Sequence, residues 1–266
     1  MLKATKKRVH IIPSQLLNPP NPISVNIIGV GGTGSCFLTA VARMNFALNA
    51  LGHSGLDVKL FDSDVVTDAN LGRQLFTESE LGMNKAVALI NRTNRFFGTN
   101  WKAVTERYGN VSHLSSDYLA NITISCVDTI ESRKAICSLL YKQEHEYTRH
   151  RDKPIYLLDL GNGKETGQAW LSTVGQVKQP ESKKFKTVGD LDDIFKTYPK
   201  ILEELTDDDE PSCSLAQALN KQDLFINSVL ANMGASILWS FFRVGILEHR
   251  GFFLNLKDFR SQPVAV

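Results

Sequence analysis

The chain has 266 residues, 42% hydrophobic and 22% charged, and its 30 basic and 28 acidic side chains leave a formal net charge of +2. These proportions exclude a disordered or fibrous chain, and the near balance of charge argues against nucleic acid as a partner. The four cysteines contain no C-x-x-C pair, so we expect no disulfide framework, no zinc site and a reducing, cytoplasmic compartment.

Short β-branched apolar runs alternate with longer segments of helical periodicity, which is typical of an α/β fold with a parallel sheet. The expected strands are Ile23–Val30, Leu56–Asp62, Trp101–Glu106, Asn121–Asp128 and Ile155–Leu160. The expected helices between them are Gly34–Leu51, Asn84–Phe97 and Ile130–Gln143. This order predicts a Rossmann-like, doubly wound and mostly parallel sheet, with the nucleotide-binding half over about residues 23–160.

The rest of the chain is less regular. Gln168–Val174 is expected to be a strand, and about residues 176–212 are expected to form a polar crossover loop, because they show no sustained apolar period. A C-terminal helix and an antiparallel hairpin are expected over about residues 213–256. No linker composition separates two cores, so we expect a single domain over residues 1–266.

Within this last region, a buried helix is expected around Phe225–Phe242 and a hairpin over Gly245–Leu256 that turns at residues 249–251. The apolar run Phe225–Leu247 is interrupted by polar and charged side chains, including Arg243, which are costly to bury in lipid. We therefore expect a core helix here and no membrane partner.

The first expected strand runs directly into Gly29-Val30-Gly31-Gly32-Thr33-Gly34, a loop with G-x-G-x-x-G spacing. Glycines allow the chain to turn tightly and bring backbone N–H groups against phosphate at a helix N-terminus. The strand before the loop and the helix after it favour nucleotide binding over a turn needed only for packing. Asp62, at the end of the next strand, is placed to hydrogen-bond a ribose.

Polar residues after Asp62 favour ATP over NAD as the nucleotide. They are Asp64, Asn70, Arg73, Gln74 and, at the start of the next helix, Lys85. A triphosphate needs such groups, because an arginine binds two oxygens at once and a lysine supplies a point charge. Asp128, at the carboxyl end of a buried strand, is expected to hold Mg²⁺ through water. The alternatives are that Arg73 and Lys85 are solvated surface charges and that Asp128 is a helix N-cap.

Together these motifs resemble the ThiF/MoeB/HesA family, relatives of the ubiquitin-activating enzymes. The resemblance covers about residues 25–174 and is carried by G-V-G-G-T-G, F-D-S-D-V-V-T-D-A-N-L-G-R-Q-L-F, N-K-A and C-V-D-T-I-E-S-R. More narrowly, D-A-N-L-G-R-Q-L-F with N-R-F-F-G-T-N-W is similar to the ThiF-like member of the bacterial PRTRC cassette, which implies a bacterial protein.

The resemblance implies ATP-dependent adenylation of the C-terminal carboxylate of a ubiquitin-like or small carrier protein. It places Gly31 and Gly32 on the phosphates and Asp62 on the ribose. Asn70, Arg73 and Lys85 would line the triphosphate, and Asp128 would serve Mg²⁺, whereas Arg133 is either functional or structural. A carboxylate is already ionised at neutral pH, so this chemistry needs no general base.

The resemblance also implies a homodimer in which a basic N-terminal residue reaches the ATP of the partner. Lys6, Lys7 or Arg8 is the candidate, with a solvated basic tail as the alternative.

Pro211-Ser212-Cys213-Ser214-Leu215 resembles the P-x-C-[T/S]-[L/I] pattern of a thioester-forming cysteine. A position before a helix would favour the Cys213 thiolate, while the four carboxylates of residues 207–210 would oppose it. The alternative is that Cys213 is simply a small residue at the start of a helix, with no catalytic role. The remaining cysteines, Cys36, Cys126 and Cys137, lie in apolar patterns and are expected in the core.

Two other functions compete with adenylation. One is an NAD-dependent oxidoreductase, which uses the same glycine loop. The other is a non-catalytic module that holds ATP and recruits partners through the crossover loop.

Overall fold

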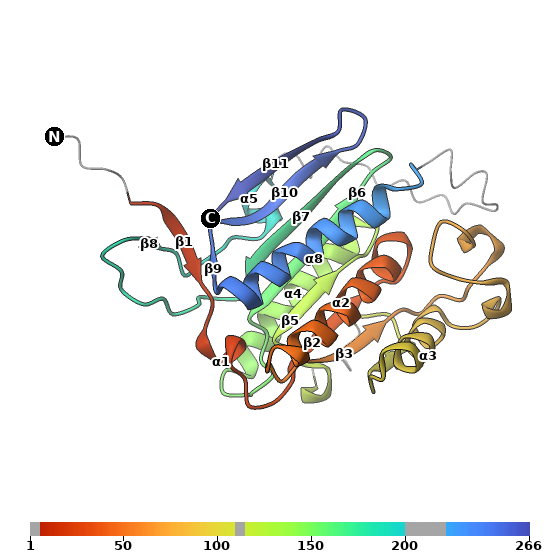
Figure 1. Ribbon diagram of the computed structural model, residues 1–266, viewed down its shortest axis with the longest axis horizontal. Coiled ribbons are helices and arrows are strands. Elements are labelled where there is room, and N and C mark those ends of the chain that lie inside the picture. The colour runs from red at the N-terminus through yellow and green to blue at the C-terminus, as the bar shows by residue number, and fades with distance from the viewer. Residues whose placement is uncertain (1–5, 110–114, 200–221) are drawn as a thin grey trace.

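The computed structural model of the protein describes residues 6–109, 115–199 and 222–266. An eight-stranded sheet lies at its centre, in the order β11-β10-β7-β6-β5-β2-β3-β4 (Figure 1). Five neighbouring strands pair in parallel: β2 (Ile23–Ile28), β3 (Leu56–Phe61), β4 (Lys102–Val104), β5 (Ile122–Ser125) and β6 (Tyr156–Asn162). This arrangement confirms the predicted Rossmann-like, mostly parallel sheet.

The register of the parallel strands sets where a ligand can enter. Ile28, at the end of β2, pairs with Phe61 at the end of β3 and with Ser125 at the end of β5. Every residue of β2 and β5 is buried, as expected for strands covered on both faces. The segments that follow β2, β3 and β5 therefore leave the sheet side by side, at the edge where open α/β sheets bind ligands.

Three antiparallel strands extend the sheet on the other side of β6. They are β7 (Thr166–Thr173), β10 (His249–Asn255) and β11 (Arg260–Ala265). The predicted antiparallel C-terminal extension is thus confirmed, but the hairpin turn predicted at residues 249–251 is wrong. Gly251 lies inside β10, where a Cβ would collide with the carbonyl oxygen of Ala169, so this glycine serves the close approach of two strands.

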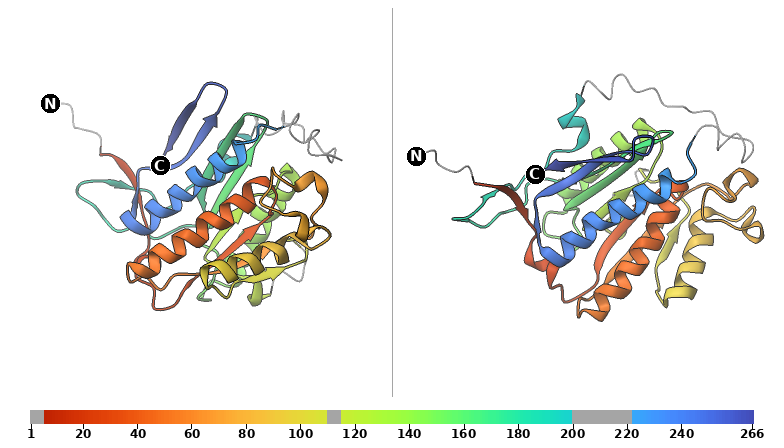
Figure 2. Two further views of the ribbon diagram at one scale, coloured as in Figure 1. Left: turned by 45° about the vertical axis from the view of Figure 1, so that its right-hand side comes forward. Right: turned by 45° about the horizontal axis from the view of Figure 1, so that its top comes forward.

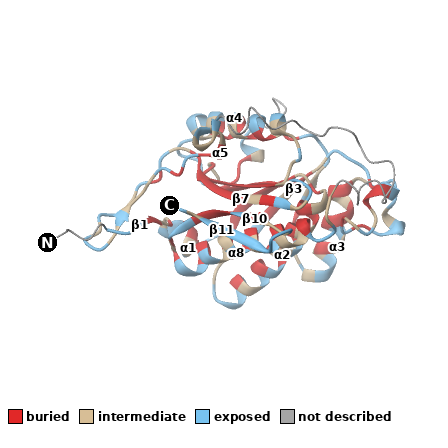
Figure 3. Cartoon of the chain, turned by 90° about the horizontal axis from the view of Figure 1, so that it is seen from above, coloured by how far each residue is buried: buried red, intermediate tan, exposed pale blue. Residues whose placement is uncertain are grey.

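Helices cover both faces of the sheet (Figures 2 and 3). One face carries α1 (Ser14–Leu17), α2 (Gly32–Ala50), α3 (Lys85–Phe97) and α8 (Ile226–Val244), and the other carries α4 (Ile130–Glu146) and α5 (Ile194–Thr197). Short 3₁₀ helices span Asp68–Asn70 (η1), Glu78–Glu80 (η2) and Ser116–Tyr118 (η4). The first long helix begins at Gly32, two residues before the predicted start, and Gly31 is its N-cap.

The predicted buried helix around Phe225–Phe242 is α8, which packs along α2. Phe37, Leu38, Leu230 and Phe241 are almost fully buried in the main hydrophobic core, to which α2 and α8 contribute. None of the helices in the described residues has the length and apolar character needed to cross a bilayer.

A segment near the N-terminus and part of the predicted crossover loop hold each other in place. Strand β1 (Arg8–Ile11) pairs in parallel with β8 (Lys186–Thr187) and antiparallel with β9 (Ile246–Leu247) in a separate three-stranded sheet. Part of the predicted crossover loop is therefore regular structure, namely β8 and α5 (Ile194–Thr197), while residues 200–212 lie outside the described ranges. Such short strands depend on partners distant in sequence, so local periodicity did not indicate them.

Candidate functional site

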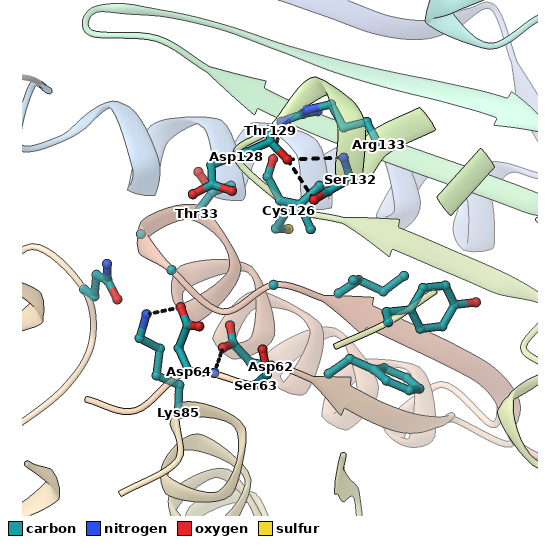
Figure 4. A pocket seen from close by; sticks show the side chains of 18 of the residues that line it. Thr33, Asp62, Ser63, Asp64, Lys85, Cys126, Asp128, Thr129, Ser132 and Arg133 are labelled. Atoms are coloured by element: carbon teal, nitrogen blue, oxygen red, sulfur yellow. Dashed lines mark hydrogen bonds and ion pairs between the residues drawn. The ribbon is translucent and has the colours of Figure 1, made fainter. Parts of the chain in front are cut away.

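A cavity of about 450 Å³ opens where β2, β3 and β5 end (Figure 4). Its walls come from the glycine loop after β2, the segment after β3 and the turn between β5 and α4. The predicted site residues that line it are Gly29, Gly31, Gly32, Asp62, Asp64, Arg73, Gln74, Lys85 and Asp128. Residues from three separate parts of the chain therefore meet in one polar cavity.

The glycine loop forms the wall at the N-terminus of α2. Gly29 has a φ of 83°, a left-handed conformation that favours glycine. Gly34 does not line the cavity, and a Cβ there would overlap the carbonyl oxygen of Gly29, so its role is close packing. The first N–H groups of a helix have no acceptor within the helix, and they carry partial positive charge. This wall is suited to an anion such as phosphate.

Asp62 connects the glycine loop to the end of β3. The N–H of Val30 donates to Asp62 Oδ2 at 2.7 Å, and the N–H of Asp64 donates to Oδ1 at 2.8 Å. Burial is the largest influence and raises the pKa of the Asp62 carboxyl. Each carboxylate oxygen has more than one lone pair, so both can accept a further hydrogen bond from a ligand.

Lys85 lies at the start of α3 with its side chain only 10% exposed. Its Nζ is 3.0 Å from Asp64 Oδ2, and Figure 4 shows the two side chains pointing toward each other. The Asp64 side chain is 67% exposed. This lysine is therefore held at the cavity by a carboxylate that itself faces solvent.

Arg73 is half-buried, and burial lowers the pKa of its guanidinium. Its Nη1 donates to Gln222 Oε1 at 2.7 Å. Within the described ranges, Nε is buried and has no hydrogen-bond partner, and Arg73 forms no ion pair with the acidic residues there. A guanidinium with unused donors at a cavity is suited to an anionic ligand.

Asn70 does not line the cavity but shapes the turn that presents Arg73 and Gln74. Its Oδ1 accepts hydrogen bonds from the N–H of Thr67 at 2.9 Å and from the Thr67 hydroxyl at 3.1 Å. Its carbonyl oxygen accepts from the N–H of Gln74 at 3.0 Å. The Asn70 oxygens thus stabilise η1 and the turn that follows.

Asp128 is exposed at the rim of the cavity, and the alternative that it caps the next helix is wrong. Thr129 is the N-cap of α4, and its hydroxyl accepts from the N–H of Ser132 at 3.2 Å. No group of three or more histidine, cysteine or acidic side chains that could hold a metal occurs in residues 6–109, 115–199 and 222–266. One free carboxylate does fit Mg²⁺ that is bound mainly through phosphate oxygens and water.

Arg133 is buried in the wall of the cavity, and its Nη1 lies 2.7 and 2.6 Å from the two carboxylate oxygens of Asp159. Its Nη2 donates to the carbonyl oxygen of Val127, which follows β5, and to that of Leu160, which lies in β6. These contacts favour the structural interpretation of Arg133, because the side chain ties together the ends of two adjacent strands.

Several lining residues were missed by sequence reasoning: Thr33, Arg107, Tyr108, Ser132, Asn162, Gln222 and Asn227. Arg107, Tyr108 and Asn162 follow or end parallel strands, so applying the strand-end rule to every strand would have found them. Gln222 and Asn227 come from the far end of the chain and carry no local signal.

The three described cysteines pack against the hydrophobic cores, as predicted. Cys36 and Cys126 are half-buried against the main core, and Cys137 is half-buried against a second, smaller core. Cys126 also lines the cavity, and burial raises its pKa strongly. Cys213 lies outside the described residues.

The basic N-terminal residues do not line the cavity of their own chain. Lys6 Nζ donates to the carbonyl oxygen of Ser182 at 3.1 Å, and Lys7 Nζ is 2.5 Å from Glu248 Oε2. Arg8 begins β1. A contact with the ATP of a partner subunit stays a prediction.

Comparison with known proteins gives matches in sequence and in structure. Residues 13–151, more than half of the chain, match the ThiF family. Ubiquitin-like modifier-activating enzyme 5 of Aedes aegypti is 30% identical over 127 residues, which cover 42% of this chain and 30% of that protein. The enzyme of the same name from Branchiostoma floridae is 30% identical over 127 residues, covering 42% and 29%. The matched segment thus spans about a third of the length of these curated relatives.

Solved structures of low sequence identity share the fold. PaaA superposes with a TM-score of 0.58 at 17% identity, covering 95% of this chain and 65% of its own. E. coli MccB, solved with ATP, superposes with a TM-score of 0.57 at 15% identity, covering 94% and 65%.

Proposed function

The chain belongs to the ThiF family, and we propose that it catalyses ATP-dependent adenylation of the C-terminal carboxylate of a ubiquitin-like or small carrier protein. The observation that carries the proposal is the cavity at the strand ends. It places the N-terminus of α2 on one wall and Arg73 and Lys85 on another. A polyphosphate is the nucleotide group that such a distribution of positive charge suits.

In the proposed reaction, a carboxylate oxygen of the carrier attacks the α-phosphorus of ATP. A new C(O)O–P bond forms, the bond from the α-phosphorus to the bridging oxygen breaks, and pyrophosphate leaves with that electron pair. The carboxylate is already ionised at neutral pH, so no side chain has to remove a proton. The catalytic work is positioning and neutralisation of phosphate charge, which Arg73 and Lys85 would supply.

We assign the remaining nucleotide contacts by position. The N–H groups at Gly31 and Gly32 would face the phosphates, with Gly29 and Gly34 shaping the turn, and Asp62 would accept from the ribose. Asp64 would hold Lys85 until the phosphates bind. Mg²⁺, when bound, would add positive charge at the phosphates, and Asp128 would hold it through water.

The names of similar proteins agree with this chemistry. The curated relatives are activating enzymes for ubiquitin-like modifiers, and E. coli MccB has been solved with ATP and with MccA. We further propose that residues 1–266 form one adenylation domain of the PRTRC type and act as a homodimer.

The test is ATP–pyrophosphate exchange with a candidate carrier protein present. Exchange is expected with the wild type and is expected to be lost in Arg73→Ala and Lys85→Ala. Lys102→Ala, which removes an exposed lysine of β4 outside the cavity, is the matched control and should retain exchange. Tight ATP binding without exchange for any carrier would favour the non-catalytic module, and binding of NAD instead of ATP would favour the oxidoreductase.

Transfer of the acyl group to Cys213 is a separate proposal. The Cys213→Ala variant should keep pyrophosphate exchange but lose a thiol-sensitive covalent adduct with the carrier. An unchanged adduct would eliminate this role.

A further inference from the structure

Arg73 and the glycine loop are connected by side chains from the region where α8 begins. Arg73 Nη1 donates to Gln222 Oε1 at 2.7 Å, and Asn227 Nδ2 donates to the same oxygen at 2.8 Å. Gln222 precedes α8, and Asn227 lies in its first turn and is 3% exposed. All three residues line the cavity.

The other end of Asn227 meets the glycine loop. The Thr33 hydroxyl lies 2.9 Å from Asn227 Oδ1 and 3.1 Å from Asn162 Oδ1, so its single proton is shared between the two oxygens. A Cβ on Gly32 would lie 2.5 Å from the Asn227 amide, so the loop backbone packs directly against this side chain. The position of Asn227 therefore depends on the position of the glycine loop.

These contacts determine which way each amide faces. A carboxamide has one accepting and one donating end. Thr33 donates to Asn227 Oδ1, so Asn227 Nδ2 faces Gln222. Gln222 Oε1 then lies between two donors, one from Asn227 and one from Arg73, and Gln222 Nε2 lies 3.5 Å from the carbonyl oxygen of Gly163.

Within the described part of the chain, the acceptor for the Arg73 side chain is Gln222. Arg73 forms no ion pair there, and its buried Nε has no hydrogen-bond partner among those residues. Without Gln222, the long arginine side chain would gain rotamer freedom that a bound phosphate must then remove.

We propose that Gln222 and Asn227 are positioning residues that hold Arg73 toward the polyphosphate of ATP, and that this contact gives the site its preference for ATP over AMP. The inference rests on the proposed use of ATP. In this proposal, selectivity for the triphosphate depends on the side-chain amides of Gln222 and Asn227, which the glycine loop orients.

The experiment measures ATP and AMP dissociation constants by calorimetry for the wild type, Gln222→Leu, Arg73→Ala and the double variant. Leucine has a similar volume but no acceptor. We expect Gln222→Leu to weaken ATP binding about tenfold, which corresponds to about 1.4 kcal/mol, and AMP binding less than about twofold. In the Arg73→Ala background, Gln222→Leu should have no further effect on ATP, since coupled residues are not additive.

Two further variants separate positioning from damage to the fold. Asn227→Asp replaces the donor that faces Gln222 by an oxygen, so it should give the same ATP-selective loss. Asn232→Ala lies on the exposed face of α8 and should bind both nucleotides as the wild type does.

The positioning role would be overturned if the variants weakened ATP binding and AMP binding equally. It would also be overturned if the effects of Gln222→Leu and Arg73→Ala on ATP binding were additive. Wild-type ATP binding without pyrophosphate exchange would refute the proposed adenylation alone, because the affinities still test the positioning role. Absence of ATP binding by the wild type would overturn both.

Discussion

Replacing Arg133 by methionine is expected to destabilise the protein strongly, because the change leaves Asp159 without its counter-charge. The two side chains are 9% and 8% exposed, and their closest atoms are 2.6 Å apart. Asp159 accepts hydrogen bonds from Arg133 on both oxygens. A buried carboxylate that loses its partner retains its full desolvation cost.

The magnitude follows from this burial. Removing one partner of a buried ion pair costs about 3–5 kcal/mol, a large share of a total stability of about 5–15 kcal/mol. A domain of this size loses roughly 2–4 °C in melting temperature per kcal/mol, so a fall of about 6–20 °C is expected. ATP binding should weaken too, because Arg133 also holds the carbonyl of Val127, which adjoins Asp128.

Urea denaturation followed by tryptophan fluorescence measures the effect. The double variant Arg133→Met, Asp159→Asn should recover most of the lost free energy, since a buried pair replaced by neutral groups is often tolerated. Arg95→Met, at an exposed arginine of α3, is the control and should change stability by less than about 0.5 kcal/mol. A cost of less than about 1 kcal/mol for Arg133→Met, or a double variant less stable than the single one, would contradict this role of the ion pair.

Three other predictions concern packing and titration. Gly34→Ala should lower the unfolding free energy by about 3 kcal/mol, because its Cβ overlaps the Gly29 carbonyl oxygen, and an unchanged urea midpoint would contradict this. His10 is fully buried against Tyr156, and burial lowers its pKa below the ordinary 6.5, so stability should fall as the pH drops below that value. His10→Gln should remove that part of the loss between about pH 7.5 and about pH 5.5, and an equal loss in both proteins would disprove the assignment. Burial raises the pKa of Cys137 to about 12, so mass spectrometry should find it alkylated at about pH 8 far more slowly in the native than in the urea-unfolded protein.

Local patterns were enough for the parallel half of the sheet. Apolar β-branched runs and helical periodicity placed β2, β3, β5 and β6 within a few residues, because a buried strand needs a continuous apolar run. The prediction of the hairpin turn at residues 249–251 was wrong because the local signal was ambiguous. Glycine fits both a turn and a close approach of strands, and the sequence does not show that Ala169 lies against Gly251.

In the candidate site, too, local patterns predicted some features and tertiary contacts decided the others. The glycine loop, Asp62, Arg73 and Asp128 were identifiable because each ends or follows a predicted strand, and the carboxyl ends of parallel strands meet at one edge of a sheet. The roles of individual residues within the cavity could not be identified from the sequence. The sequence did not indicate that Asn70 shapes a turn or that Thr129 caps α4, because several neighbouring polar residues suit each position.

The sequence by itself determined the order of strands and helices in the parallel half of the sheet and the edge at which polar residues gather, since both follow from hydrophobic periodicity and chain direction. Tertiary structure alone decided which distant side chains meet. Arg73 and Gln222 are 149 positions apart, and Thr33 and Asn227 are 194 apart. Contacts over such separations depend on how α8 packs along α2, and no periodic pattern in either segment encodes them.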